Sequence, residues 1–247
     1  MLEKVDGVII KSNDYGETNK IVTIFSKKLG KISALARGAK KPKSRMAAVT
    51  QPFIFGQFYI YVNSGLSTIQ QGEVIDSFRA VREDIIKTAY CAYIVELTDK
   101  LTEPKSPDGY IFEELLDTIR WIEANEDAAI PIMMYELKLF KKGGFAPTVH
   151  SCSNCGSKER LRAFSIREAG LLCSDCSSLD PNAFAVSPAI AKLLYVFSNV
   201  ELKRVGTISV KQENIKMLRE MIDVYYEQYG GYFLKSRKVI NQLHLLK

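Results

Sequence analysis

The sequence predicts an α+β protein with several domains: a five-stranded OB-type barrel, a helical domain and a four-cysteine ribbon inserted into that helical domain. Three observations support this fold class. Residues 3–75 show strand patterning, the chain on both sides of 149–179 shows helical periodicity, and two Cys-x2-Cys pairs lie inside that interval. We therefore divide the chain into residues 1–80 (barrel), 81–148 and 180–247 (two parts of the helical domain) and 149–179 (ribbon).

The N-terminal part predicts five short strands, because β-branched and aromatic residues cluster or alternate between turn signals. Five strands within about 75 residues fit a small closed barrel better than a sandwich, which needs about seven. We prefer an OB-type barrel, although an SH3-like barrel has nearly the same strand spacing. The predicted strands cover residues 5–10, 21–25, 31–38, 53–62 and 67–75.

The rest of the chain, apart from the ribbon, predicts helices. An amphipathic stripe covers residues 82–101. Neither helical stretch has a complete core of its own, so we expect residues 181–247 to pack on 81–148. Pairs that begin or end helices mark the remaining helix boundaries: Ser106-Pro107 and Ser187-Pro188 at the starts, and Gly143-Gly144 and Gly230-Gly231 at the ends.

Four of the five cysteines form a metal-binding pattern. They are Cys152, Cys155, Cys173 and Cys176, two Cys-x2-Cys turns with seventeen residues between them. Four thiolates suit one structural Zn²⁺ ion and leave no open position for a catalytic water, so we predict a zinc ribbon. An iron–sulfur cluster uses the same ligands, and disulfides are disfavoured by the odd cysteine count. Cys91 is expected to be a small buried hydrophobe and His150 a residue beside the site.

No enzyme is predicted. The two histidines have no catalytic context, and neither a P-loop nor a Gly-x-Gly-x-x-Gly motif occurs. The carboxylates lie mainly at helical spacing and are explained by solvated helix faces. The chain has no run of eighteen apolar residues and no signal-peptide pattern at its start, so we expect a cytoplasmic protein.

Positive charge is concentrated near the N-terminus. The net charge is +6, and no acidic residue occurs from Thr18 to Gly72, where nine Lys and Arg residues lie. An uncompensated run of this kind attracts a polyanion, whereas a solubilising surface mixes both signs. Stacking candidates are Tyr15, Phe53, Phe55, Phe58, Tyr59 and Tyr61, about half of which must be core. The predicted DNA-binding residues are Lys27, Lys28, Lys31, Arg37, Lys40, Lys41, Lys43 and Arg45.

Several motifs in combination resemble the bacterial RecO family of DNA repair and recombination mediators. They are Asp14-Tyr15-Gly16-Glu17, Leu29-Gly30-Lys31, the run Ala36-Arg37-Gly38-Ala39-Lys40-Lys41-Pro42-Lys43-Ser44-Arg45, and Gln51-Pro52-Phe53. The resemblance implies an N-terminal OB-fold that binds single- and double-stranded DNA. It also implies annealing of complementary strands and, with RecR, help in loading RecA onto DNA coated by single-strand DNA-binding protein.

The resemblance further implies a zinc site at the four cysteines, a nucleoid-associated location, and a pocket in the helical part for the acidic C-terminal tail of single-strand DNA-binding protein. For that pocket the sequence offers only electrostatic candidates: Lys203, Arg204, Lys235, Arg237 and Lys238. Three alternatives stay open. They are an RNA-binding OB and zinc-ribbon protein of translation or transcription, a zinc-ribbon ligase or nuclease, and a scaffold that binds acidic proteins.

Overall fold

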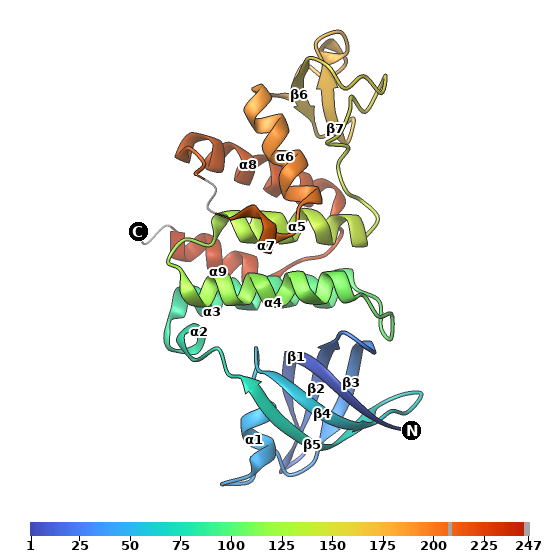
Figure 1. Cartoon of the computed structure of the whole chain (residues 1–247), viewed down its shortest axis with the longest axis vertical. Coiled ribbons are helices and arrows are strands. Elements are labelled where there is room, and N and C mark those ends of the chain that lie inside the picture. Colours follow the sequence, from blue (N-terminus) through green and yellow to red (C-terminus); the bar gives the residue numbers. More distant parts are fainter. Residues whose placement is uncertain (207–208, 245–247) are drawn as a thin grey trace. The chain divides into compact units, whose positions relative to one another are not determined.

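The structure, a computed structural model, describes residues 1–206 and 209–244. The chain forms two compact units (Figure 1). One unit contains Met1–Glu126 together with the segment that starts at Leu234, and the other contains Asp127–Phe233. The domain boundaries drawn from the sequence remain a prediction. Among the described residues, no helix combines the length and apolar character that crossing a bilayer requires.

The first unit begins with a closed five-stranded barrel in the order β1-β2-β3-β5-β4. All neighbouring strands are antiparallel except β3 and β5. The predicted OB-type barrel is therefore confirmed. Its strands are β1 (Leu2–Tyr15), β2 (Asn19–Ser26), β3 (Gly30–Ala36), β4 (Phe55–Tyr61) and β5 (Ser67–Asp76).

The barrel interior is filled by inward-facing aliphatic residues and Phe58, which is fully buried. Phe53 is also buried, so the expectation that some of the candidate aromatics belong to the core is confirmed. A short helix that the sequence patterns did not predict, α1 (Arg45–Val49), packs against β5 and places Val49 in the core. Five residues are too few for helical periodicity to stand out.

Helices α2 (Arg79–Glu83), α3 (Ile85–Leu101) and α4 (Gly109–Ala124) complete most of the first unit. The predicted helix over 82–101 is interrupted at Asp84, whose carboxylate caps α3. The predicted cap at Ser106-Pro107 is wrong, because the side chain of Asp108 caps α4 by accepting from the Ile111 N–H at 3.0 Å. The backbone of Ser106 instead lies so close to Gly30 that a Cβ at Gly30 would collide with it.

The last described helix, α9 (Lys235–His244), packs on α3 within the same unit. The Glu96 carboxylate accepts hydrogen bonds from the backbone N–H groups of Lys235 and Ser236 and from the Ser236 hydroxyl. These bonds satisfy the first donors of α9 and lower the pKa of Glu96, although burial alone would raise that pKa.

The second unit is built around the buried helix α5 (Ala129–Lys142), against which α6 (Pro188–Asn199) and α8 (Gln212–Tyr229) pack. The predicted helix ends at Gly143 and Gly230 and the predicted Ser187 cap are confirmed. A three-stranded sheet of β6 (Leu161–Ser165), β7 (Gly170–Cys173) and β8 (Phe184–Ala185), a 3-10 turn at Ser177–Leu179, and α7 (Leu202–Val205) complete the unit.

Candidate nucleic-acid interface and metal centre

The structure separates the eight predicted DNA-binding cations into two groups at opposite ends of β3. Lys27, Lys28 and Lys31 lie at the β2–β3 turn, and the other five follow the end of the strand. Seven residues of strand span about 20 Å, so the two groups cannot form one compact patch.

The group at the β2–β3 turn is occupied by ion pairs. Lys27 donates to Glu113 at 2.8 Å, and this hydrogen bond raises the pKa of Lys27. Lys28 donates to Glu3 at 2.6 Å. The side chain of Lys31 is only 12% exposed and donates to the backbone oxygen of Asp99, with the Asp99 carboxylate 3.3 Å away. Lys27 and Lys31 thus join the barrel to helices α4 and α3 of its own unit, and Lys28 pairs within the barrel, with Glu3 of β1.

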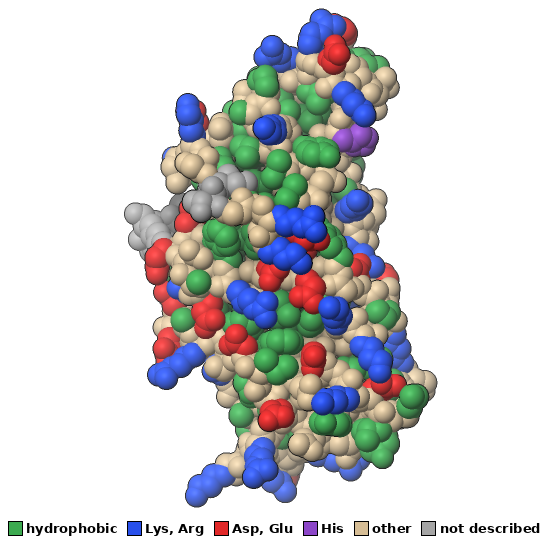
Figure 2. Space-filling model, in the orientation of Figure 1, with side chains coloured by type: hydrophobic (Ala, Val, Ile, Leu, Met, Phe, Trp, Pro, Cys, Tyr) green, Lys and Arg blue, Asp and Glu red, His purple; other side chains and the backbone are tan. Residues whose placement is uncertain are grey.

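The second group forms what we call the basic loop, residues 37–45. Its cations Arg37, Lys41, Lys43 and Arg45 are exposed and make no ion pair in the described part of the chain. Lys40 is partly neutralised, because its Nζ lies 2.9 Å from Asp14 and its hydrogen bond lowers the pKa of that carboxyl. Figure 2 shows Lys and Arg side chains crowded at the lower tip of the view, over the loop that precedes α1.

The basic loop is anchored to the turn between β1 and β2. The Gly38 N–H donates to Asn19 Oδ1 at 2.9 Å, and the Lys40 N–H donates to the Thr18 carbonyl at 2.9 Å. Tyr15, at the same end of β1, is 53% exposed. In OB-folds, strands 2 and 3 and the β1–β2 loop are common places for oligonucleotides to bind. The anchored loop therefore lies at the same end of the barrel as an exposed ring, at a position typical of nucleic-acid binding, and four of its cations make no ion pair among the residues that the structure describes.

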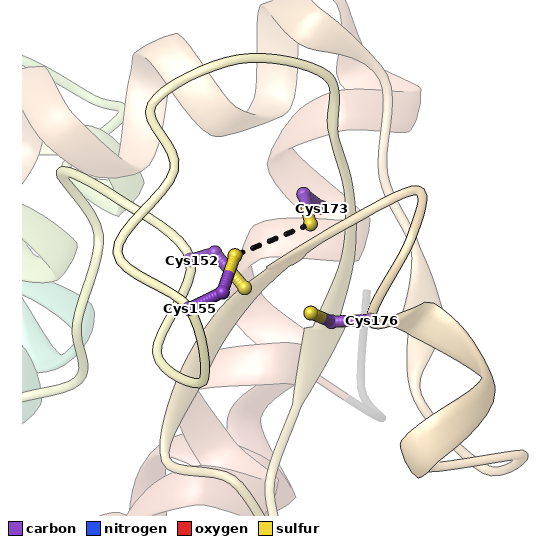
Figure 3. A group of neighbouring side chains, drawn as sticks. All are labelled: Cys152, Cys155, Cys173 and Cys176. Carbon is purple, nitrogen blue, oxygen red and sulfur yellow. Dashed lines mark hydrogen bonds between the residues drawn. The ribbon is translucent and has the colours of Figure 1, made fainter.

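The four cysteine sulfurs of the second unit converge on one point (Figure 3). All four Sγ atoms lie within 4.8 Å of one another, and those of Cys155 and Cys173 are 3.7 Å apart. No disulfide links the cysteines in the described residues, and a disulfide needs about 2.05 Å between sulfurs. Four sulfurs about 2.3 Å from one tetrahedral ion are about 3.8 Å apart, so the cluster can hold a metal ion.

The surroundings of the sulfurs favour the thiolate at Cys152 and disfavour it at Cys176. Burial disfavours ionisation of Cys152, but the N–H groups of Cys155, Cys173 and Asn154 point at its sulfur and lower its pKa to about 6. For Cys176 the Asn154 amide, at 3.3 Å, favours the thiolate, yet burial and the neighbouring thiols raise the pKa to about 12. Close thiolates repel one another, so a bound cation is needed for all four to ionise.

The polypeptide around the cysteines has the predicted ribbon form. Gly156 has a positive φ of 76°, which a side chain would strain, and this lets the chain turn tightly after Cys155. Strand β6 pairs with β7, which ends at Cys173. The third strand, β8, was not predicted, because two residues carry no periodic signal. Cys91 is fully buried in α3, in the first unit, and burial raises the pKa of its thiol.

The protein thus belongs to a class with two characteristic parts. One is an OB-type barrel that carries an exposed basic loop, and the other is a largely helical unit that carries a four-thiol metal-binding cluster. The chain matches the family model described as Recombination protein O N terminal over residues 1–78 and the one described as Recombination protein O C terminal over residues 82–238. The chain therefore belongs to the RecO family, a family of DNA repair and recombination proteins.

Curated relatives agree over nearly the whole chain. A DNA repair protein RecO of Oceanobacillus iheyensis is 59% identical over 243 residues, covering 98% of this chain and 94% of the relative. DNA repair proteins RecO of Bacillus pumilus and Bacillus subtilis are 45% and 42% identical over 247 residues. These alignments cover all of this chain and 96% and 97% of the relatives, respectively.

Proposed function

We propose that this chain binds DNA through the basic loop and serves as a recombination and repair mediator. In this role it anneals complementary strands and, with RecR, helps RecA replace single-strand DNA-binding protein. The observation that carries the proposal is the basic loop, whose four exposed cations make no ion pair among the described residues, at the end of β1 where Tyr15 is exposed, in a chain that belongs to a DNA repair family.

The proposed contacts are electrostatic and independent of base sequence. Arg37, Lys41, Lys43 and Arg45 would lie along successive phosphates, and each contact releases condensed counterions. The ring of Tyr15 offers a stacking surface that accepts any base. Lys27, Lys28 and Lys31 contribute little in this proposal, because carboxylates or a carbonyl already occupy their ammonium groups.

Annealing needs no covalent step in this proposal. Two complementary strands repel through their phosphates, and a protein that neutralises both lowers the free energy of their encounter. Contacts to the backbone leave the base edges free to pair. Because the same contacts also hold duplex DNA, release of the product depends on salt and on competition from free single strands.

The four cysteines are proposed to hold one structural Zn²⁺ ion, which would fix the two Cys-x2-Cys turns and the ends of β6 and β7. We also propose, on family resemblance alone, that RecR and the acidic tail of single-strand DNA-binding protein are partners, and that the protein acts at DNA in the cytoplasm, associated with the nucleoid. The electrostatic candidates for the tail, Lys203, Arg204, Lys235, Arg237 and Lys238, remain predictions.

Equilibrium binding of labelled oligonucleotides tests the proposal. The full-length protein should bind single- and double-stranded DNA with a strong salt dependence and should accelerate annealing of naked complementary strands without any nucleotide. Tighter binding to RNA than to DNA at equal salt, together with no acceleration of DNA annealing, would favour the alternative of an RNA-binding protein of translation or transcription.

A further inference from the structure

The second unit contains a basic groove between the cysteine ribbon and α6, with a volume of about 490 Å³. Sites for small ligands have volumes of about 300–1,000 Å³, so the groove has room for a few groups of a longer ligand. Its walls come from three segments: the chain just before the first cysteine, the stretch from Lys158 to Arg162, and one face of α6.

The charge of the groove is of one sign. Lys158, Arg160, Arg162 and Lys192 line it together with His150, and no Asp or Glu is among its described lining residues. Arg160 is paired with Asp175 at 2.8 Å. The other three Lys and Arg side chains are exposed and make no ion pair within the part of the chain that the structure describes. A concave surface lined by cations attracts an anionic ligand.

Helix α6 adds an aromatic ring to this basic wall. Pro188, Ala191, Lys192 and Tyr195 line the groove at the spacing i, i+3, i+4 and i+7, which is one face of a helix. Tyr195 is 48% exposed. The small side chain of Ala191 and the ring of Pro188 leave the floor apolar. The groove thus combines phosphate-binding cations with an exposed ring on an apolar face.

The opposite wall is fixed by the cysteine ribbon. The Cys152 N–H donates to the Ser157 carbonyl at 2.7 Å, just before Lys158. The Ser174 N–H donates to the Arg160 carbonyl at 2.9 Å, which ties this wall to the second cysteine turn. The Val186 N–H donates to the Arg162 carbonyl at 2.8 Å and joins β6 to the segment that leads into α6.

From these observations we infer that the groove is a second binding site for single-stranded nucleic acid, separate from the basic loop. Lys158, Arg162 and Lys192 would contact consecutive phosphates, and Tyr195 would stack on a base. The inference extends the proposed DNA-binding function, but it concerns a different unit of the chain. A protein with two sites for single strands can hold two strands at once, which would bring complementary strands together for annealing.

The test measures binding of an oligothymidine to the full-length protein by fluorescence anisotropy over a range of salt concentrations. The variant Lys158→Ala/Arg162→Ala/Lys192→Ala should lower the slope of log K against log salt by about 2, because each phosphate contact to a single strand contributes about 0.7. The control variant Lys141→Ala/Lys211→Ala/Lys216→Ala removes the same charge from exposed positions of the same unit outside the groove and should leave the slope nearly unchanged. Equal changes in both variants would overturn the inference.

Substitutions at Tyr195 test the proposed stacking contact without changing the charge of the groove. Tyr195→Ala should weaken binding by about 5- to 100-fold, whereas Tyr195→Phe should bind as the wild type does, because only the ring is needed for stacking. A strand containing 5-iododeoxyuridine should crosslink to Tyr195 under ultraviolet light. Unchanged binding of Tyr195→Ala together with crosslinks confined to the first unit would refute the site.

Two further measurements distinguish the proposed groove site from binding by the basic loop and from docking of an acidic protein. The groove variant should lose affinity to the same degree when Arg37, Lys41, Lys43 and Arg45 are already alanine, so failure of the basic loop to bind DNA would not hide the result. A polyglutamate peptide should compete poorly with oligothymidine. If the peptide binds the groove and the oligonucleotide does not, the groove is a docking site for an acidic protein and the inference is wrong.

Discussion

The basic loop gives the sharpest quantitative prediction. We consider the variant Arg37→Ala/Lys41→Ala/Lys43→Ala/Arg45→Ala, which removes the four exposed cations without an ion-pair partner in the described structure. Lys40 is kept, because Asp14 partly neutralises it. Exposed side chains of this kind change folding stability by less than about 0.5 kcal/mol each, so the variant should fold normally.

The magnitude follows from counterion release. Four lost contacts to a single strand reduce the slope of log K against log salt by about 2.8. Because this electrostatic contribution fades toward 1 M salt, the variant should bind a short single strand about 600-fold more weakly at 0.1 M, or by ~3.8 kcal/mol.

The assay is anisotropy of a labelled oligonucleotide from 0.05 to about 0.5 M salt, a range chosen around the Debye length of about 10 Å at 0.1 M. The matched control is Lys27→Ala/Lys28→Ala, whose ammonium groups are paired with Glu113 and Glu3. It should change the slope by less than one phosphate contact, about 0.7. A slope unchanged in the loop variant, or changed equally in the control, would refute the assignment of DNA binding to the basic loop.

Three other changes test the rest of the structure. Cys173→Ser should remove the bound metal and expose residues 149–179 to proteolysis, whereas the control Cys91→Ala should keep one metal ion per chain. Elemental analysis measures the metal content of both variants, and full metal content in Cys173→Ser would disprove the four-thiolate site. Glu136→Gln should destabilise the second unit by about 1–3 kcal/mol in urea unfolding, because the buried Glu136 carboxylate accepts two hydrogen bonds from Arg219. The control is Glu220→Gln at an exposed position, and equal stability of the two variants would contradict a stabilising role of the Glu136 carboxylate. The folded-state pKa of Glu96 is lowered, so the stability that its carboxylate gives α9 is complete above its ordinary pKa of 4.5 and is lost as pH falls through the lowered folded-state pKa. Hydrogen-exchange protection factors in α9, which correct for the intrinsic pH dependence of exchange, should fall at low pH in the wild type but not in Glu96→Gln, and identical pH profiles would argue against the cap.

Much of the fold could be predicted because it depends on patterns of residues that are close together in the sequence. Strand alternation, the Ser187 cap and the glycines that end α5 and α8 each depend on a few neighbouring residues, and the structure confirms them. Local signals also compete. Ser106-Pro107 has the composition of a helix start, but Asp108 is two residues further on, and its carboxylate makes the hydrogen bond that caps the helix.

The candidate sites show the limit of local reasoning more clearly. The four cysteines could be grouped from spacing alone, because each pair is a tight turn. The cations could not be sorted in the same way. Lys27 is paired with a residue 86 positions away and Lys31 with one 68 positions away. Only the folded chain shows that these ammonium groups already have partners within the protein.

The basic groove was missed for the same physical reason. Its cations are scattered between Lys158 and Lys192, among acidic residues that balance them in the sequence. The pairing of β6 with β8 brings the start of α6 beside the ribbon and creates a one-sign surface. The only local feature of the groove in the sequence is the helical spacing of Lys192 and Tyr195. That spacing alone does not predict a binding site, because the residues of the opposite wall are distant in the sequence.

In the mediator role that we propose, the chain also anneals complementary DNA strands that single-strand DNA-binding protein already covers. The most direct test measures annealing of complementary oligonucleotides that are fully coated with the cognate single-strand DNA-binding protein, without nucleotide and at moderate salt. The account predicts acceleration by the wild type and by Lys27→Ala/Lys28→Ala, and little or none by the basic-loop variant. Annealing at the uncatalysed rate, with folded wild-type protein that contains its metal, would contradict the account.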